Sequence, residues 1–183
     1  ACGTGTFTYR ALDASGWLSN TATGTVTINC TNSAPVAVSD VLAATEDSIN
    51  NTYSILSNDT DSDTGDTLSI SGIITTTANG TLTISGTTQV VYTPDANFCG
   101  TNTFTYRAKD AFWPLASNTA TGTITVTCVN DNPVATNDSA TTNRNTNVTT
   151  FVLANDTDVD HSIAQLSVTG VTSITGGIAS ISG

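Results

Sequence analysis

The sequence contains no methionine, a single histidine and only 4 lysines and arginines, against 15 aspartates and glutamates. Its formal charge of −11 at pH 7 disfavours binding to nucleic acid and to anionic membranes, and it favours divalent cations and basic partners. No run approaches the roughly eighteen apolar residues that a membrane-spanning helix needs. We therefore expect neither nucleic-acid binding nor membrane insertion.

The usual helix formers leucine, lysine, glutamate and methionine are all scarce. Threonine, serine, asparagine and glycine are abundant instead, and β-branched threonine suits the solvent face of a strand. This composition predicts an all-β protein with a wetted, acidic surface. It is typical of a secreted protein, so we expect an extracellular location at the cell surface.

Much of the sequence occurs twice. Residues 2–30 return almost unchanged as residues 99–128, and residues 35–37 recur at 133–135, so the period is 97–98 residues. A period of this length is too long for one turn of a solenoid, and it predicts one small domain per repeat.

The copies divide the chain into three parts. Residues 35–132 form a complete unit, residues 1–34 match only its C-terminal half, and residues 133–183 match only its N-terminal half. Neither half contains enough strands to close a core alone. We expect the sequence to be a window cut from a longer polypeptide; the alternative is that neighbouring chains complete the halves.

Apolar and polar residues alternate with a period of two in about seven short runs of the complete unit. In the sixth run Phe104 and Tyr106 fall on one face, and Thr103 and Thr105 fall on the other. The number and spacing of the runs predict a seven-stranded sandwich of immunoglobulin type. The expected strands span residues 36–44, 48–56, 67–75, 80–84, 89–92, 103–108 and 119–128.

Four cysteines lie at matching positions of the two copies, Cys2 with Cys30 and Cys99 with Cys128. Each pair brackets what the pattern predicts to be the last hairpin of a domain. The even count, the repetition and the secreted composition predict one disulfide within each pair. Free buried thiols are the alternative.

The predicted hairpin register conflicts with these disulfides by one residue. If Phe104 and Ile124 share the core face, the two cysteines of a pair are one position out of step. A one-residue bulge at Gly3 and at Gly100 would bring each pair together, because glycine is well suited to the backbone of a bulge.

Aspartates recur at alternate positions in a loop of each copy, starting at residues 59 and 156. A hard cation such as calcium prefers several carboxylate and carbonyl oxygens, which such a loop can supply. The EF-hand pattern is absent, because Thr64 and His161 occupy the place of its turn glycine. A solvated turn explains the same residues without a metal. The candidate calcium ligands are Glu46, Asp59, Asp61, Asp63, Asp110, Asp131, Asp156, Asp158 and Asp160.

The chain resembles the tandem cadherin-like and immunoglobulin-like repeats of large bacterial surface proteins and adhesins. The resemblance rests on VNDNPVA at 129–135, NDTDSDTGDTLSI at 58–70, VVYTPDANFCGTNTFTY at 90–106 and NTATGTITVT at 118–127. It implies sandwich domains strung end to end, export to the cell surface, and calcium at the junctions between domains. The sequence departs from this pattern in its cysteines and at residues 32–34, which lowers the expectation of calcium at the first junction.

Nothing in the sequence points to catalysis. His161 is the only histidine and stands in a loop where the other copy has Thr64, so no histidine-based triad recurs. Alternating aspartates on a turn offer no deep pocket for a glycosidase. We expect no enzymatic activity.

The repeats predict a structural module of a long extracellular fibre, filament or stalk, whose partners are further copies of itself in the same chain or in neighbouring subunits. The first alternative is an adhesin that binds a glycan or a cell-surface protein through its end loops, where Trp17 and Trp113 lie. The second is an accessory domain of a secreted enzyme.

Overall fold

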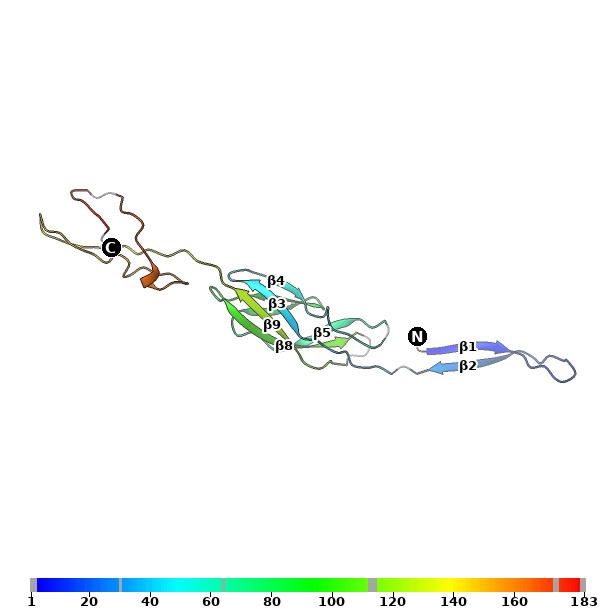
Figure 1. Cartoon of the computed structure of the whole chain (residues 1–183). Coiled ribbons are helices and arrows are strands. Elements are labelled where there is room, and N and C mark those ends of the chain that lie inside the picture. Colours follow the sequence, from blue (N-terminus) through cyan, green and yellow to red (C-terminus); the bar gives the residue numbers. More distant parts are fainter. Residues whose placement is uncertain (1–2, 30, 64, 112–114, 173–174, 182–183) are drawn as a thin grey trace.

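The chain forms an elongated row of three parts in a computed structural model (Figure 1). An N-terminal hairpin of β1 (Gly3–Tyr9) and β2 (Ala22–Ile28) is followed by a central sandwich and then by a C-terminal segment. The structure describes residues 3–29, 31–63, 65–111, 115–172 and 175–181.

The central part is the predicted seven-stranded β-sandwich. One sheet has four strands in the order β3-β9-β8-β5, and the other has three in the order β4-β7-β6. All pairs are antiparallel except β3 and β9, which run parallel. The strands are β3 (Asp40–Thr45), β4 (Asn51–Ser54), β5 (Leu68–Thr75), β6 (Thr81–Ser85), β7 (Gln89–Thr93), β8 (Gly100–Asp110) and β9 (Ala120–Thr127).

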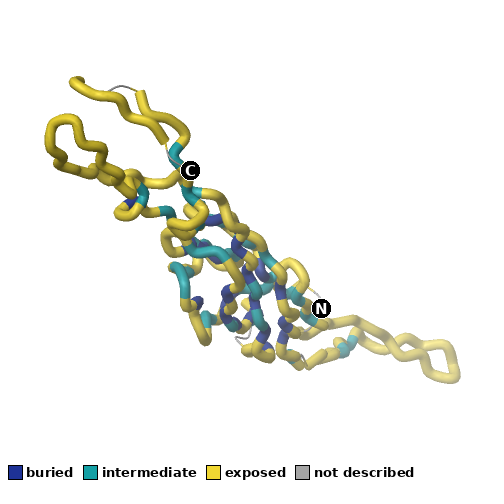
Figure 2. The backbone as a smooth tube through the Cα atoms, turned by 60° about the vertical axis from the view of Figure 1, so that its left-hand side comes forward, coloured by how far each residue is buried: buried dark blue, intermediate teal, exposed yellow. Residues whose placement is uncertain are grey.

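The core follows from the alternation of apolar and polar residues. Along β8 and β9 the apolar side chains are buried between the sheets, and most of the threonines between them face solvent. Figure 2 shows that buried residues concentrate in this central part. The largest apolar side chains of the core are Ile55, Val90, Tyr92, Phe104, Tyr106 and Ile124.

The first expected strand, residues 36–44, splits into two pieces. Val36 pairs with Thr60, whereas the chain from Asp40 onward pairs with β9. Between them the backbone N–H of Ala37 donates to Asn118 Oδ1 at 3.0 Å, and that of Val38 donates to a side chain as well. Side chains therefore replace strand partners between the Val36–Thr60 bridge and β3.

In the β8–β9 hairpin Phe104 and Ile124 are both buried, as predicted, and the disulfide is one residue out of step with the register. Gly100 lies opposite Val126, yet Cys99 bonds to Cys128 rather than to a residue at position 127. Gly100 has a φ of +137°, a conformation that side-chain-bearing residues rarely adopt. The predicted irregularity at this glycine is therefore present. Cys2 and Cys30 lie outside the described residues.

The C-terminal segment contains no strand among its described residues, although its sequence matches the N-terminal half of the sandwich. It holds an isolated bridge between Val134 and Thr157 and one short 3-10 helix, η1 (Ile163–Gln165). In the central domain the corresponding first strand pairs with β9, and no strand pairs with this segment in that way among the described residues. In the described parts of the chain, no helix has the length and apolarity to cross a membrane.

Candidate functional site

Acidic side chains gather at both ends of the central sandwich, where it joins its neighbours. The first cluster lies in the loop between β4 and β5, where Asp61, Asp63 and Asp66 bring carboxylate oxygens within 4.8 Å of one another. The backbone N–H of Asp63 donates to Asp61 Oδ1 at 2.8 Å, which fixes the loop. Asp63 Oδ2 accepts the backbone N–H of Ser33 at 2.6 Å, so the loop also holds the linker.

Asp110 of β8 also lies near this first cluster. It is buried at the end of β8, opposite Leu68 of β5, and the side-chain amide of Asn32 donates to its Oδ2 at 2.9 Å. Burial raises the pKa of Asp66, and the charges of Asp61, Asp110 and Asp63 raise it further. These carboxylates are therefore close enough to repel one another.

The second cluster lies between the sandwich and the C-terminal segment. The backbone N–H of Asp131 donates to Asp160 Oδ2 at 2.6 Å, and that of Asp160 donates to Asp158 Oδ1 at 2.8 Å. Glu46, which directly follows β3, is buried and accepts the backbone N–H of Val129 at 2.8 Å. Residues of the sandwich, the linker and the next segment thus meet at one junction.

The carboxylates of this second cluster are close enough for their charges to interact. Burial raises the pKa of Asp131, and the charges of Asp47, Asp160, Glu46 and Asp158 act in the same direction. Burial also pushes the pKa of Asp158 upward, but hydrogen bonds from Asp160 and His161 outweigh it and leave that pKa below its ordinary value. The Nδ1 atom of His161 lies 3.3 Å from Asp158 Oδ1.

The two junctions have the same construction despite their different residues. Ser33 and Asp131 occupy equivalent linker positions, and each donates its backbone N–H to the corresponding loop aspartate at 2.6 Å. The second junction adds a linker carboxylate where the first has a hydroxyl. The sequence difference at residues 32–34 therefore removes one candidate acidic ligand from the first junction, and the linker keeps the same hydrogen bond to the loop.

Two of the nine candidate ligands point elsewhere. Asp59 Oδ1 accepts the backbone N–H of Val38 at 2.8 Å and lies 3.2 Å from the Tyr106 hydroxyl. Asp156 is buried and accepts the backbone N–H of Thr136 at 2.8 Å. Each carboxylate binds a backbone N–H of its own repeat, which alternate spacing alone could not reveal.

Asp66 and Asp47 contribute charge at the junctions although they are outside those nine candidates. Asp66 supplies one of the three clustered carboxylates at the first junction, and the charge of Asp47 reaches Asp131 at the second. Asp47 directly follows Glu46, and Asp66 belongs to the same acidic loop as Asp63, so the sequence already placed both near the candidates.

The donor atoms fit a hard divalent cation. Within the described residues, three buried carboxylate oxygens have no hydrogen-bond partner, and two of them, Asp61 Oδ2 and Asp131 Oδ2, belong to the two junction clusters. A buried oxygen without a donor is costly unless a cation or water meets it. Carboxylates and backbone carbonyls are also the ligands that calcium prefers.

The expected contact residues lie away from these clusters. Trp17 is 76% exposed in the loop that joins β1 to β2. Its backbone N–H and that of Ser15 donate to Asp13 Oδ1, which shapes the loop while the indole faces solvent. Trp113 falls outside the described residues.

Two family models match the chain in succession. Residues 32–128 match the bacterial cadherin-like domain, and residues 130–183 match the bacterial Ig domain. Domains of these two kinds are typically non-catalytic and usually lie outside the cell. A comparison with curated proteins found no match.

Among solved structures, an endo-fucoidan hydrolase from glycoside hydrolase family 107 is similar at 21% sequence identity, with a TM-score of 0.34. The similarity covers 74% of this chain and 21% of that structure, so the chain spans about a fifth of its length. A TM-score this low supports no inference about activity.

Proposed function

Because this chain belongs to the bacterial cadherin-like domain family, we propose that it is a structural repeat module of an extracellular filament or stalk of a cell-surface protein. Its work is mechanical, and it catalyses no reaction. The proposal is supported by the way in which the sandwich is connected to the chain on either side.

The first and last strands of the sandwich are parallel neighbours, which is the observation that carries the proposal. Six consecutive residue pairs join β3 to β9, from Asp40 opposite Gly122 to Thr45 opposite Thr127. The chain enters and leaves the sandwich at opposite ends (Figure 1). Tension along the row therefore shears the whole ladder at once, whereas an antiparallel terminal pair would be opened one hydrogen bond at a time.

The disulfide reinforces the strand that leaves the domain. Cys128 directly follows β9, and its bond to Cys99 fixes it to the start of β8. A pull on the following linker is thus shared between two strands. The bond also prevents 29 residues from extending even after the domain has unfolded.

Calcium at the two junctions would make the row of domains rigid. Asp61, Asp63, Asp66 and Asp110 would hold it at the first junction. Glu46, Asp131, Asp158 and Asp160 would do so at the second. A bound cation supplies positive charge that cancels the mutual repulsion of these carboxylates. The affinity expected of an extracellular module is a Kd of about 10⁻⁴–10⁻³ M.

Force spectroscopy tests the mechanical proposal. Proline at position 41 or 42 must remove a ladder hydrogen bond of β3, since alternate residues of an edge strand face its partner. Val41→Pro or Leu42→Pro should therefore lower the unfolding force. The matched changes Leu82→Pro and Thr83→Pro alter β6, an edge strand outside the force path. An equal loss of force from both pairs would contradict the proposal.

A second function, contact with a glycan or a cell-surface protein, is favoured by one observation. The indole of Trp17 is exposed at a loop that lies at one extremity of the molecule (Figure 1). Exposed tryptophan suits stacking on sugar rings or packing in a partner's interface. Titration of the chain with surface oligosaccharides should quench tryptophan fluorescence, and Trp17→Ala should abolish the change. Unchanged fluorescence throughout would reject the glycan form of this proposal.

A further inference from the structure

The N-terminal hairpin exposes the face that its counterpart buries. Phe7 and Tyr9 of β1 are 55% and 53% exposed, whereas Phe104 and Tyr106 at the equivalent positions of β8 are fully buried. Val26 and Ile28 of β2 are exposed in the same way. A contiguous aromatic and aliphatic face of this kind normally marks an interaction surface.

The hairpin already has the conformation that it has inside a closed domain. The rings of Phe7 and Tyr9 lie 6.2 Å apart at 39°, and those of Phe104 and Tyr106 have the same separation and angle. The Phe7 ring also covers Gly24 as the Phe104 ring covers Gly122. The exposed face is therefore preorganised for the contacts that the central hairpin makes.

Acceptor groups of three residues surround the tyrosine hydroxyl inside the central domain. The Tyr106 hydroxyl lies 2.8 Å from the carbonyl oxygen of Ile55 and 3.0 Å from that of Val38. It lies 3.2 Å from Asp59 Oδ1. All three acceptors come from the N-terminal half of the repeat, which the C-terminal segment duplicates.

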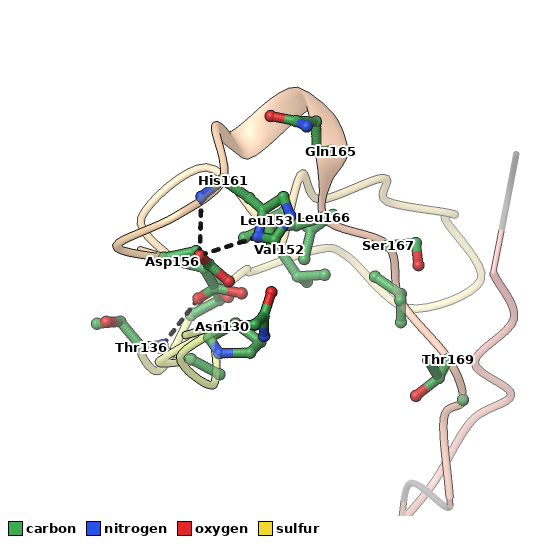
Figure 3. A pocket seen from close by; sticks show the side chains of 16 residues that line it. Asn130, Thr136, Val152, Leu153, Asp156, His161, Gln165, Leu166, Ser167 and Thr169 are labelled. Carbon is green, nitrogen blue, oxygen red and sulfur yellow. Dashed lines mark hydrogen bonds and ion pairs between the residues drawn. The ribbon is translucent and has the colours of Figure 1, made fainter. Parts of the chain in front are cut away.

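The C-terminal segment has the matching acceptors around an open cavity of 640 Å³ (Figure 3). The repeat places Thr136, Val152 and Asp156 at the positions of Val38, Ile55 and Asp59, and all three line the cavity. Asp156 accepts the backbone N–H of Thr136 at 2.8 Å, as Asp59 does from Val38. The rest of the lining includes apolar side chains such as Leu153, Leu166 and Val168.

We propose that the β1–β2 hairpin of one copy of this chain inserts into this cavity of a second copy and takes there the place that β8 and β9 have in the central sandwich. The Tyr9 hydroxyl then meets the carbonyl oxygens of Thr136 and Val152 and the carboxylate of Asp156. By the β3–β9 register, residues 138–143 form a parallel strand beside β2, with Ala140 opposite Val26.

The assembly is head to tail. The hairpin and the cavity lie at opposite ends of the molecule (Figure 1), so one copy cannot fill its own cavity. The donating and accepting surfaces differ, and contacts of this heterologous kind continue from copy to copy. Head-to-tail association would make a second copy the partner in the proposed filament, and its relevance rests on that proposed function.

Two variants of the 183-residue chain, each with one of the two surfaces blocked, test the proposal; we call them the capped variants. Tyr9→Asp places a carboxylate on the donating face, and Val152→Asp places one in the cavity. Each variant alone should associate about 100-fold more weakly than the unmodified chain, because burying an ionised carboxylate is costly. The unmodified chain should form a concentration-dependent series of oligomers in analytical ultracentrifugation. A mixture of the two variants should form dimers and nothing larger, since each retains one intact surface.

The matched controls place the same charge on positions whose counterparts are exposed in the central sandwich. Thr6→Asp corresponds to exposed Thr103, and Val159→Asp corresponds to exposed Ser62, so both variants should assemble as the unmodified chain does. The proposal would be overturned if the unmodified chain stayed monomeric or if the mixture of capped variants formed no dimers. It would also be overturned if the control variants associated as weakly as the capped variants. Correct folding of each capped variant is checked by the melting temperature and unfolding force of its central domain, which should both be unchanged. Those two measurements test the mechanical role separately.

Discussion

Cys99 and Cys128 are joined by a disulfide although they are one position out of register in the β8–β9 ladder. The offset is absorbed at Gly100, whose φ of +137° lets the chain turn out of the regular strand. The bond thus lies at the exit of the domain, where tension on the following linker would act. This placement predicts how the domain responds to reduction.

Reduction of the Cys99–Cys128 bond should lengthen the unfolded domain and destabilise the folded one. Release of 29 residues, at about 3.5 Å each, adds about 100 Å to the contour length in force spectroscopy. Loss of a crosslink with this separation costs about 3–4 kcal/mol in the chain-entropy model. Cys99→Ser/Cys128→Ser should reproduce both effects without reductant. An unchanged contour length would show that the disulfide does not restrain extension.

Calcium should stabilise the chain through the junction carboxylates. The melting temperature should rise between chelator and millimolar calcium, and Asp61→Asn/Asp63→Asn should abolish the part of the rise due to the first junction. Asp95→Asn is the matched control, because Asp95 is an exposed acid of the same sandwich away from the cluster. The cluster would be a solvated turn if calcium left the melting temperature of the unmodified chain unchanged.

Asp40 should make the central domain less stable as the pH rises. Burial raises its pKa to about 6, and the charge of Asp59 acts in the same direction. An unfolded aspartate titrates near pH 4, so the folded state binds the proton more tightly. Stability should be highest below pH 4, fall by about 2–3 kcal/mol between pH 4 and pH 6, and then level off.

The change Asp40→Asn should remove most of this pH dependence. Urea unfolding at pH 4, 6 and 8, with chelator present to keep the junction clusters out of the comparison, measures the effect. Asp95→Asn again serves as the control and should retain the fall. Parallel pH profiles for the unmodified chain and Asp40→Asn would show that another group is responsible.

Gly122 should tolerate no side chain, because a Cβ atom there would lie 2.2 Å from the Phe104 ring. That ring is enclosed in the core, so Gly122→Ala should cost about 2–3 kcal/mol of unfolding free energy. Gly72→Ala is the control, since nothing lies within 4 Å of its Cβ position. Gly24→Ala should disturb the hairpin little, because the exposed Phe7 ring can move aside. Similar costs at Gly72 and Gly122 would contradict this account.

The repeat, the strands of the central domain and its disulfide partners follow from local signals in the sequence. Alternation with a period of two identifies each strand of the central domain, because one face of every strand must be apolar to be buried. The shared core face of Phe104 and Ile124 and the irregularity at Gly100 follow from the same alternation. These features depend on neighbours along the chain or on one hairpin partner.

The structure alone decided which aspartates face a junction and which face the interior. Asp59 and Asp61 have the same spacing pattern, yet one holds Val38 and Tyr106 while the other joins the acidic cluster. Alternate residues of an irregular loop have no fixed faces, so their directions depend on which distant backbone groups need an acceptor. The division of the first strand has the same cause, since Asn118 supplies its hydrogen bonds from across the domain.

Burial of the repeated hairpins was likewise decided by the tertiary structure. The sequences of β1 and β8 predict the same strand with the same apolar face, because the residues that set strand and register are nearly identical. Whether Phe7 or Phe104 is covered depends on the presence of an opposing sheet, which no local pattern contains. The sequence thus determined the shape of each element, and the tertiary structure determined which faces are left to bind something else.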